Sequence, residues 1–178
     1  NNLTIQKPIQ KTLNISGAAA TITVDGTLSI LKGTLGDGNK IINVNGNIIN
    51  SGNHNGAGSI RLTGAGAQTI GGDGTGKFNN LILNKATGSS TLTANQTING
   101  TLRLANVAAI LDLSVYNLSL GSTNNIFDDI VGSGTSFSNV KMLRTSGNAS
   151  DGGLTKRFSA AAPSFTYPLG TGTDYTPT

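Results

Sequence analysis

Short runs of alternating apolar and polar residues recur along the chain, for example at 21–24, 59–62 and 101–104. Successive residues of a strand face opposite sides, so each run places its aliphatic residues on one face and Thr, Ser or Arg on the other. Segments rich in Gly and Asn, such as 36–39 and 71–74, separate the runs. These residue types tolerate positive φ and favour tight turns. The pattern therefore predicts many short strands joined by tight corners.

Two short motifs indicate a repeat. Apolar-Asx-Gly-x-apolar occurs at 24–28, 44–48 and 98–102, and Asn-Leu-x-apolar occurs at 2–5, 80–83 and 117–120. The first two copies of the former motif indicate a period of about 20 residues, and the last two copies of the latter lie close to two such units apart. Stacked coils of that length bury an aliphatic column that one coil cannot bury alone. We therefore predict an all-β fold, a β-solenoid with about 18–20 residues per coil.

Two further expectations concern the corners and one ambiguous segment. Asn side chains at equivalent corners are expected to stack into hydrogen-bonded ladders, with Asp25, Asn45 and Asn99 as candidates. The segment 106–118 allows a helix, but Leu111 and Leu113 continue the strand alternation. We favour a strand, a corner and a second strand there.

The composition changes near residue 150. Three of the four prolines and two of the three tyrosines lie beyond that point. Proline removes a donor from the strand ladder and fits poorly inside a stacked coil. We expect residues 1–150 to form the solenoid and residues 151–178 to form a C-terminal cap or the start of a following module. Such a cap would protect an exposed sheet edge.

Composition excludes several classes of protein. The chain has 25 Gly, no Glu, 4% aromatic and 11% charged residues, which argues against a helical protein. Its net charge of +4 arises from basic residues that are scattered singly, so no nucleic-acid surface is expected. No apolar run approaches the roughly 18 residues of a spanning helix, so no membrane insertion is expected. The absence of Cys excludes a disulfide framework and a thiolate metal site, and we expect no cofactor and no metal.

Three segments, residues 58–70, 78–84 and 96–104, resemble coils of large secreted surface proteins from Bacteroidetes-type bacteria. Residues 165–170, followed by 175–177, resemble the segment that often follows such coils. The resemblance implies right-handed parallel β-helix modules in adhesin-like proteins exported by the type IX system. It implies a secreted or cell-surface location, with an extracellular glycan or cell surface and flanking modules of the same chain as partners. The chain opens with Asn1-Asn2 and shows no C-terminal sorting domain, so we expect a piece of a longer protein.

One cluster could support catalysis. Parallel β-helix enzymes that cleave acidic polysaccharides use paired Asp residues for acid–base work and Lys or Arg for the substrate carboxylate. Asp128 and Asp129 could supply the pair, with Lys141 and Arg144 following within one coil. Adjacent strand residues point to opposite faces, however, so only a bend would bring both carboxylates to one site. We expect a corner pair of Asp residues and no catalytic residues.

The remaining candidates are weaker. His54 is the only histidine, and its Gly- and Asn-rich surroundings predict an exposed loop. Asp37 and Asp73 lie between glycines and predict tight turns, because calcium would need six to eight oxygen ligands. Thr-x-Thr pairs at 21–23 and 91–93 raise an ice-binding alternative, but other coils carry Asn, Arg or Ser there. The sequence predicts a non-catalytic structural or adhesive module, with a polysaccharide hydrolase or lyase and an ice-binding solenoid as alternatives.

Overall fold

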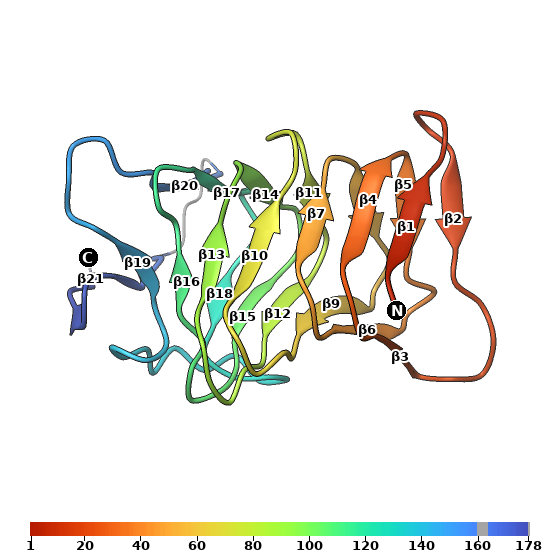
Figure 1. The fold of residues 1–178 in the computed structure, drawn as a ribbon. Helices are drawn as coiled ribbons and strands as arrows, with labels where there is room; N and C mark the ends of the chain where they lie inside the picture. The colour runs from red at the N-terminus through yellow and green to blue at the C-terminus, as the bar shows by residue number, and fades with distance from the viewer. Residues whose placement is uncertain (160–163, 178) are drawn as a thin grey trace.

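A computed structural model describes residues 1–159 and 164–177, and every regular element in that part of the chain is a β-strand. The strands form three sheets that run side by side along the molecule (Figure 1). Sheet A contains, in spatial order, β1 (Leu3–Gln6), β4 (Leu28–Lys32), β7 (Ile48–Asn50), β10 (Gln68–Gly71), β13 (Ser90–Leu92), β16 (Leu111–Asp112), β19 (Leu143–Thr145), β21 (Leu169–Thr171) and β22 (Asp174–Tyr175). Sheet B contains β2 (Thr12–Asn14), β5 (Thr34–Gly36), β8 (Asn53–Asn55), β11 (Lys77–Phe78), β14 (Gln96–Ile98), β17 (Leu118–Leu120) and β20 (Leu154–Lys156). Sheet C contains β3 (Thr21–Val24), β6 (Ile41–Val44), β9 (Ser59–Leu62), β12 (Leu81–Leu83), β15 (Leu102–Leu104) and β18 (Ile126–Phe127).

The chain visits sheets A, B and C in turn, and each strand pairs in parallel with the strand one coil away. In Figure 1 the strands of sheet A run upward in front, the chain crosses to sheet B at the top and returns through sheet C at the bottom, and the coils advance from right to left. This path is a right-handed parallel β-solenoid, as predicted. Eight parallel strands of sheet A mark eight coils, a stack of roughly 35 Å at the usual strand spacing.

Register partners give the length of each coil. Leu28 pairs with Ile48, and Ile42 pairs with Ile60. The separation along the chain within both pairs agrees with the predicted period of about 18–20 residues. The separation is much larger between the partners Leu111 and Leu143, because a long loop follows β18 before the chain rejoins sheet A. The predicted period therefore describes the early coils, and the later coils accommodate insertions at their corners.

The repeated motifs mark corners, but not the same corner. The Asx-Gly pairs at 25–26 and 45–46 lead from sheet C to sheet A, whereas the pair at 99–100 leads from sheet B to sheet C. The three Asn-Leu copies likewise begin strands of sheets A, C and B. The spacing between the copies at 80–83 and 117–120 is thus not two coils, which corrects the sequence-based interpretation.

The corners resemble one another because at each of them an Asn side chain accepts a backbone N–H from the next coil. Its side-chain Oδ1 accepts the backbone N–H of the matching residue in the next coil at 2.8–3.1 Å, as seen for Asn2, Asn47, Asn80, Asn95 and Asn117. The expected side-chain ladder also forms where Asn45 Nδ2 donates to Asp25 Oδ1 at 3.2 Å. Asn99 occupies a different corner and does not extend this ladder.

The glycine of the Asx-Gly motif is required by crowding and not by its backbone angle. A Cβ on Gly100 would lie 2.5 Å from Asn80 Oδ1 and 2.6 Å from the Asn79 carbonyl oxygen. Positive φ occurs instead in the turns that follow β5 and β10, at Gly38, Asn39 and Gly72. Close approach of neighbouring coils therefore explains glycine at this corner.

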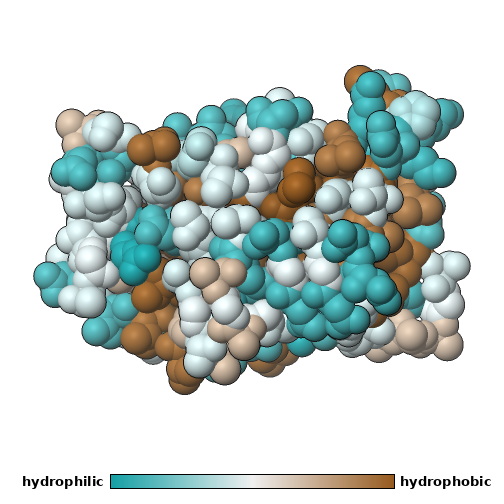
Figure 2. Space-filling view, viewed as in Figure 1, coloured by the Kyte–Doolittle hydropathy of each residue, from teal (hydrophilic) through white to brown (hydrophobic). Residues whose placement is uncertain are grey.

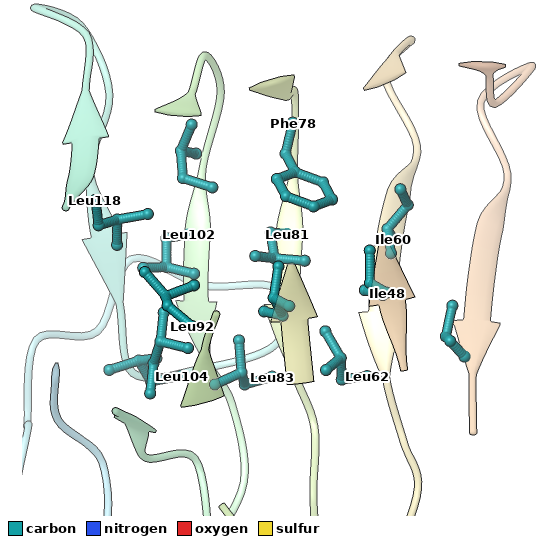
Figure 3. Close-up of a cluster of buried hydrophobic side chains, with 14 of the residues drawn as sticks. Ile48, Ile60, Leu62, Phe78, Leu81, Leu83, Leu92, Leu102, Leu104 and Leu118 are labelled. Atoms are coloured by element: carbon teal, nitrogen blue, oxygen red, sulfur yellow. The ribbon is translucent and has the colours of Figure 1, made fainter. Parts of the chain in front are cut away.

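The interior is a continuous aliphatic column. Ile60, Leu81 and Leu102 are register partners on successive strands of sheet C, and all three are almost fully buried (Figure 3). Leu83 and Phe78 fill the same interior, as Figure 3 also shows. Each such side chain contributes about 1.5–3 kcal/mol relative to exposure. On the face seen in Figure 2, hydrophilic and intermediate residues predominate, and hydrophobic residues form small separate groups.

The C-terminal strands continue the stack beyond residue 150. β20 extends sheet B and β21 extends sheet A in parallel, whereas β22 pairs antiparallel with β21. The composition changes near residue 150, but the ladder of sheet A continues to Thr171. Within 106–118 the structure has β16, a corner with Ser114 at φ 51°, and the first residue of β17, which confirms strands over a helix.

Candidate functional site

Asp128 and Asp129 follow β18, and their carboxylates have different partners. Asp129 Oδ1 accepts a hydrogen bond from Arg103 Nη1 at 2.8 Å, and Arg103 also donates to the Gly132 carbonyl at 2.8 Å. Asp128 is only 8% exposed, and Lys141 Nζ lies 4.0 Å from its Oδ2 while donating to its carbonyl oxygen at 2.8 Å. Both residues thus fasten the loop that follows β18 to the body of the solenoid.

Arg144 belongs to a different contact. It lies in β19, and its Nη2 donates to Asp112 Oδ2 at 2.8 Å across the β16–β19 pair. Of the four residues predicted as one candidate cluster, three meet around the loop and Arg144 stands in an ion pair on sheet A. Asp128 Oδ1 and Asp129 Oδ2 both lie beside Gly134, whose backbone N–H donates to Asp129 Oδ2 at 3.1 Å, so the bend of the loop brings the two carboxylates to the same side.

His54 is buried, which corrects the prediction of an exposed loop. It lies in β8, is 3% exposed, and its Nε2 is 3.0 Å from Asp37 Oδ2. Its Nδ1 accepts the Asn79 backbone N–H at 3.4 Å. Burial lowers the pKa of His54, and the opposing attraction of Asp37 is smaller. On the short strand β8 the flanking residues Asn53 and Asn55 turn outward and His54 turns inward. Since all three residues are polar, the local sequence does not indicate which of them is buried.

Asp37 and Asp73 do occupy tight turns. Asp37 Oδ1 accepts the Asn39 N–H at 2.7 Å, in the turn that precedes β6. Asp73 Oδ1 accepts the Thr75 N–H at 2.9 Å and its hydroxyl at 2.7 Å. These bonds from Thr75 lower the pKa of Asp73. Asp37 also binds His54, a partner one coil away that the local sequence could not indicate.

Buried lysines form a second group that sequence reasoning missed. Lys85 is fully buried, and its Nζ donates to the Gly64 and Gly66 carbonyls and to Gln68 Oε1 at 2.5–2.7 Å. Burial lowers the pKa of Lys85. Lys40 makes the same kind of contact with the carbonyls of Gly17 and Ala19 at 2.6 and 2.9 Å. Each ammonium binds carbonyl oxygens of a corner in the preceding coil, so these positive charges hold coils together.

The Thr-x-Thr pairs do not form one face. Residues 21–23 lie in sheet C, whereas residues 91–93 begin in sheet A. The most Thr-rich row of register partners is on sheet B, where Asn53 and Lys77 interrupt Thr34 and Thr97. A regular threonine array is therefore absent from this row.

A groove of about 320 Å³ crosses the outer face of sheet C. It extends from β6 over β9 and β12 to β15 and ends against the loop that follows β18, where Ile130 and Val131 line it. Arg61 and Arg103 both line this groove, and Asp, the only acidic residue type in the chain, is absent from its lining. The charged side chains that line the groove are thus both positive, and one of them, Arg103, is paired with the Asp129 carboxylate.

Comparisons of the chain with protein-family models, with curated proteins and with solved structures gave no match. Within residues 1–159 and 164–177, no three His, Asp or other metal-binding side chains gather as a metal site would require. The same part of the structure has no helix of the length and apolar character needed to cross a membrane.

Proposed function

We propose that this chain is a non-catalytic structural or adhesive module of a large secreted cell-surface protein. Its stacked coils act as a rigid spacer and present a long polar surface for binding. The resemblance of residues 58–70 and 96–104 to coils of secreted adhesin-like proteins supports the location and the class of partner, an extracellular glycan or cell surface.

The observation that carries this proposal is the use of polar side chains between coils. Asn80 joins β12 to the next coil, Lys85 joins a corner to the preceding one, and Arg103 fastens the loop after β18. Such cross-coil bonds resist sliding and bending of the stack, which is what a spacer needs. For the alternative, a polysaccharide hydrolase or lyase, the Asp129 carboxylate is already paired with Arg103, and Lys141 Nζ lies 4.0 Å from the Asp128 carboxylate.

A joint assay of binding and cleavage tests the proposal. The purified chain is incubated with polygalacturonate, alginate and dextran, and bound polymer, new reducing ends and unsaturated uronate absorbance are measured. We expect binding to at least one polymer with no increase in product over time. The variants Asp128→Asn and Asp129→Asn should still bind polymer and should likewise form no product. Product formation that either variant abolishes would overturn the non-catalytic assignment, and thermal hysteresis in the same preparation would favour the ice-binding alternative.

A further inference from the structure

Two arginines on the outer face of sheet C share one row but have opposite surroundings. Arg61 and Arg103 are both register partners of Ile82, so they lie two strand spacings apart, roughly 10 Å. Arg103 is paired with Asp129 and stacks over the Phe127 ring at 4.9 Å from its centroid. The guanidinium of Arg61 donates no hydrogen bond and forms no ion pair within residues 1–159 and 164–177. One guanidinium is thus neutralised, and the other carries a free charge.

The free guanidinium lies on a surface that is hollowed around it. Arg61 lines the 320 Å³ groove, and Ile82 beside it is only 6% exposed although it points to the outer face. The groove offers small polar side chains at Asn39, Ser59 and Thr101 together with apolar patches. Partial burial lowers the pKa of Arg61, which reflects its reduced contact with water. Arginine stays charged despite such a shift.

Two buried polar atoms beside the groove lack partners in the described residues. Arg61 Nε donates to nothing, and the Oδ1 atom of Asn43 accepts nothing. Asn43 is the register partner of Arg61 on the neighbouring strand, so the two side chains leave the same face of sheet C. Both atoms are shielded from the groove, so a ligand there meets Arg61 through its Nη atoms, which also have no partner in the described residues.

We propose that the groove on sheet C binds an acidic polysaccharide, with Arg61 holding the carboxylate of a uronic acid unit. Arginine presents a planar fork of donors that matches a carboxylate. The inference rests on the proposed binding function and assigns it a site and a ligand class. Arg103 does not hold ligand carboxylates; it positions the loop that closes one end of the groove.

The geometry favours a glycan over an acidic peptide. An extended peptide binds most often by adding a strand to an open sheet edge. β9 pairs on both sides, with β6 and β12, so the backbone groups beneath the groove are already used. The groove also crosses the strands instead of following an edge. Hydroxyls and amides at Ser59, Thr101 and Asn39 suit the alternating donors and acceptors of a sugar chain.

Calorimetric titration of the full chain with polygalacturonate tests the proposal. We expect Arg61→Gln to weaken binding at least tenfold and Arg61→Lys to recover part of it, because Lys keeps the charge without the fork. Lys77→Gln removes one exposed positive charge from sheet B and should leave affinity within twofold. Circular dichroism establishes that each variant remains folded.

Three probes separate the ligand classes. Dextran should not bind, and dextran sulfate and polyaspartate should bind at least tenfold more weakly than polygalacturonate. Equal binding of dextran sulfate or polyaspartate would overturn the uronate assignment. Undiminished binding by Arg61→Gln would overturn the site while leaving a non-catalytic binding module in place. Cleavage of polygalacturonate would instead overturn the proposed function, so the two failures are distinguishable.

Discussion

The Nε2 atom of His54 lies 3.0 Å from Asp37 Oδ2 in the interior of the solenoid, and both side chains are fully buried. Asn79 donates its N–H to the other ring nitrogen at 3.4 Å. The neutral ring with its proton on Nε2 therefore satisfies every contact. A second proton on Nδ1 would face the Asn79 N–H and would add a buried charge, which explains in structural terms why burial dominates the lowered pKa of His54.

This arrangement predicts that acid destabilises the fold through His54. Its folded pKa lies below the unfolded value of 6.5, so its stabilising contribution is complete above about pH 6.5 and is lost as the pH falls toward the folded pKa. His54 is the only histidine and thus the only side chain whose ordinary pKa lies between pH 5 and 8. Urea unfolding between pH 8 and 5 should show that the free energy of unfolding decreases as the pH is lowered.

The matched variant is His54→Gln, whose amide can still donate to Asp37. We expect it to be less stable than the parent by about 1–3 kcal/mol at pH 8, because one buried contact is lost. Its stability should change less between pH 7 and 5 than that of the parent. Identical pH dependence in both proteins would show that His54 does not titrate on unfolding.

Lys85→Met should destabilise the protein by about 2–4 kcal/mol. The substitution keeps the length of the side chain but leaves three buried acceptors, on Gly64, Gly66 and Gln68, without the ammonium. Lys77→Met, at an exposed position, should change stability by no more than about 0.5 kcal/mol. Comparable small effects at both positions, measured by urea unfolding, would contradict a structural role for Lys85.

Asn80→Ala should cost about 1–2 kcal/mol and expose the Thr101 amide to exchange. Asn80 Oδ1 accepts that N–H at 3.0 Å, and its Nδ2 donates to the Gly58 carbonyl at 2.8 Å, so two bonds are lost at roughly 1 kcal/mol each. Hydrogen exchange followed by NMR measures the Thr101 amide directly. The exposed Asn148→Ala variant is the control and should alter neither quantity. Unchanged protection of Thr101 in Asn80→Ala would refute the cross-coil bond.

Phe78→Ala should be the most damaging of these substitutions, at about 3–5 kcal/mol. Phe78 is fully buried among aliphatic side chains, and its removal leaves a cavity that neighbouring coils cannot close (Figure 3). Val107→Ala, at a residue that is 63% exposed, should cost less than about 0.5 kcal/mol. Thermal unfolding monitored by circular dichroism distinguishes the two, and a small loss for Phe78→Ala would mean that the column repacks.

The sequence alone determined the architecture of this protein. Alternation at 59–62 and 101–104 follows directly from the two-residue period of a strand, and its recurrence with a period near 20 residues favours stacked coils that bury one face together. The turns at Asp37 and Asp73 were likewise predictable, because each is formed by residues next to it in the chain. These features depend on local chemistry that repeats from coil to coil.

Only the tertiary structure decided which residues meet across coils. His54 reaches Asp37 from the following coil, and Arg103 reaches Asp129 in the loop of a later one. A change of one residue in a corner would shift such partners, because side chains alternate between the two faces of a strand. Local sequence therefore does not distinguish Arg61 from Arg103. The loop after β18 supplies Asp129 to Arg103 and leaves Arg61 without an acidic partner. The physical reason is that coil length is set by corner insertions, which the strand pattern does not encode.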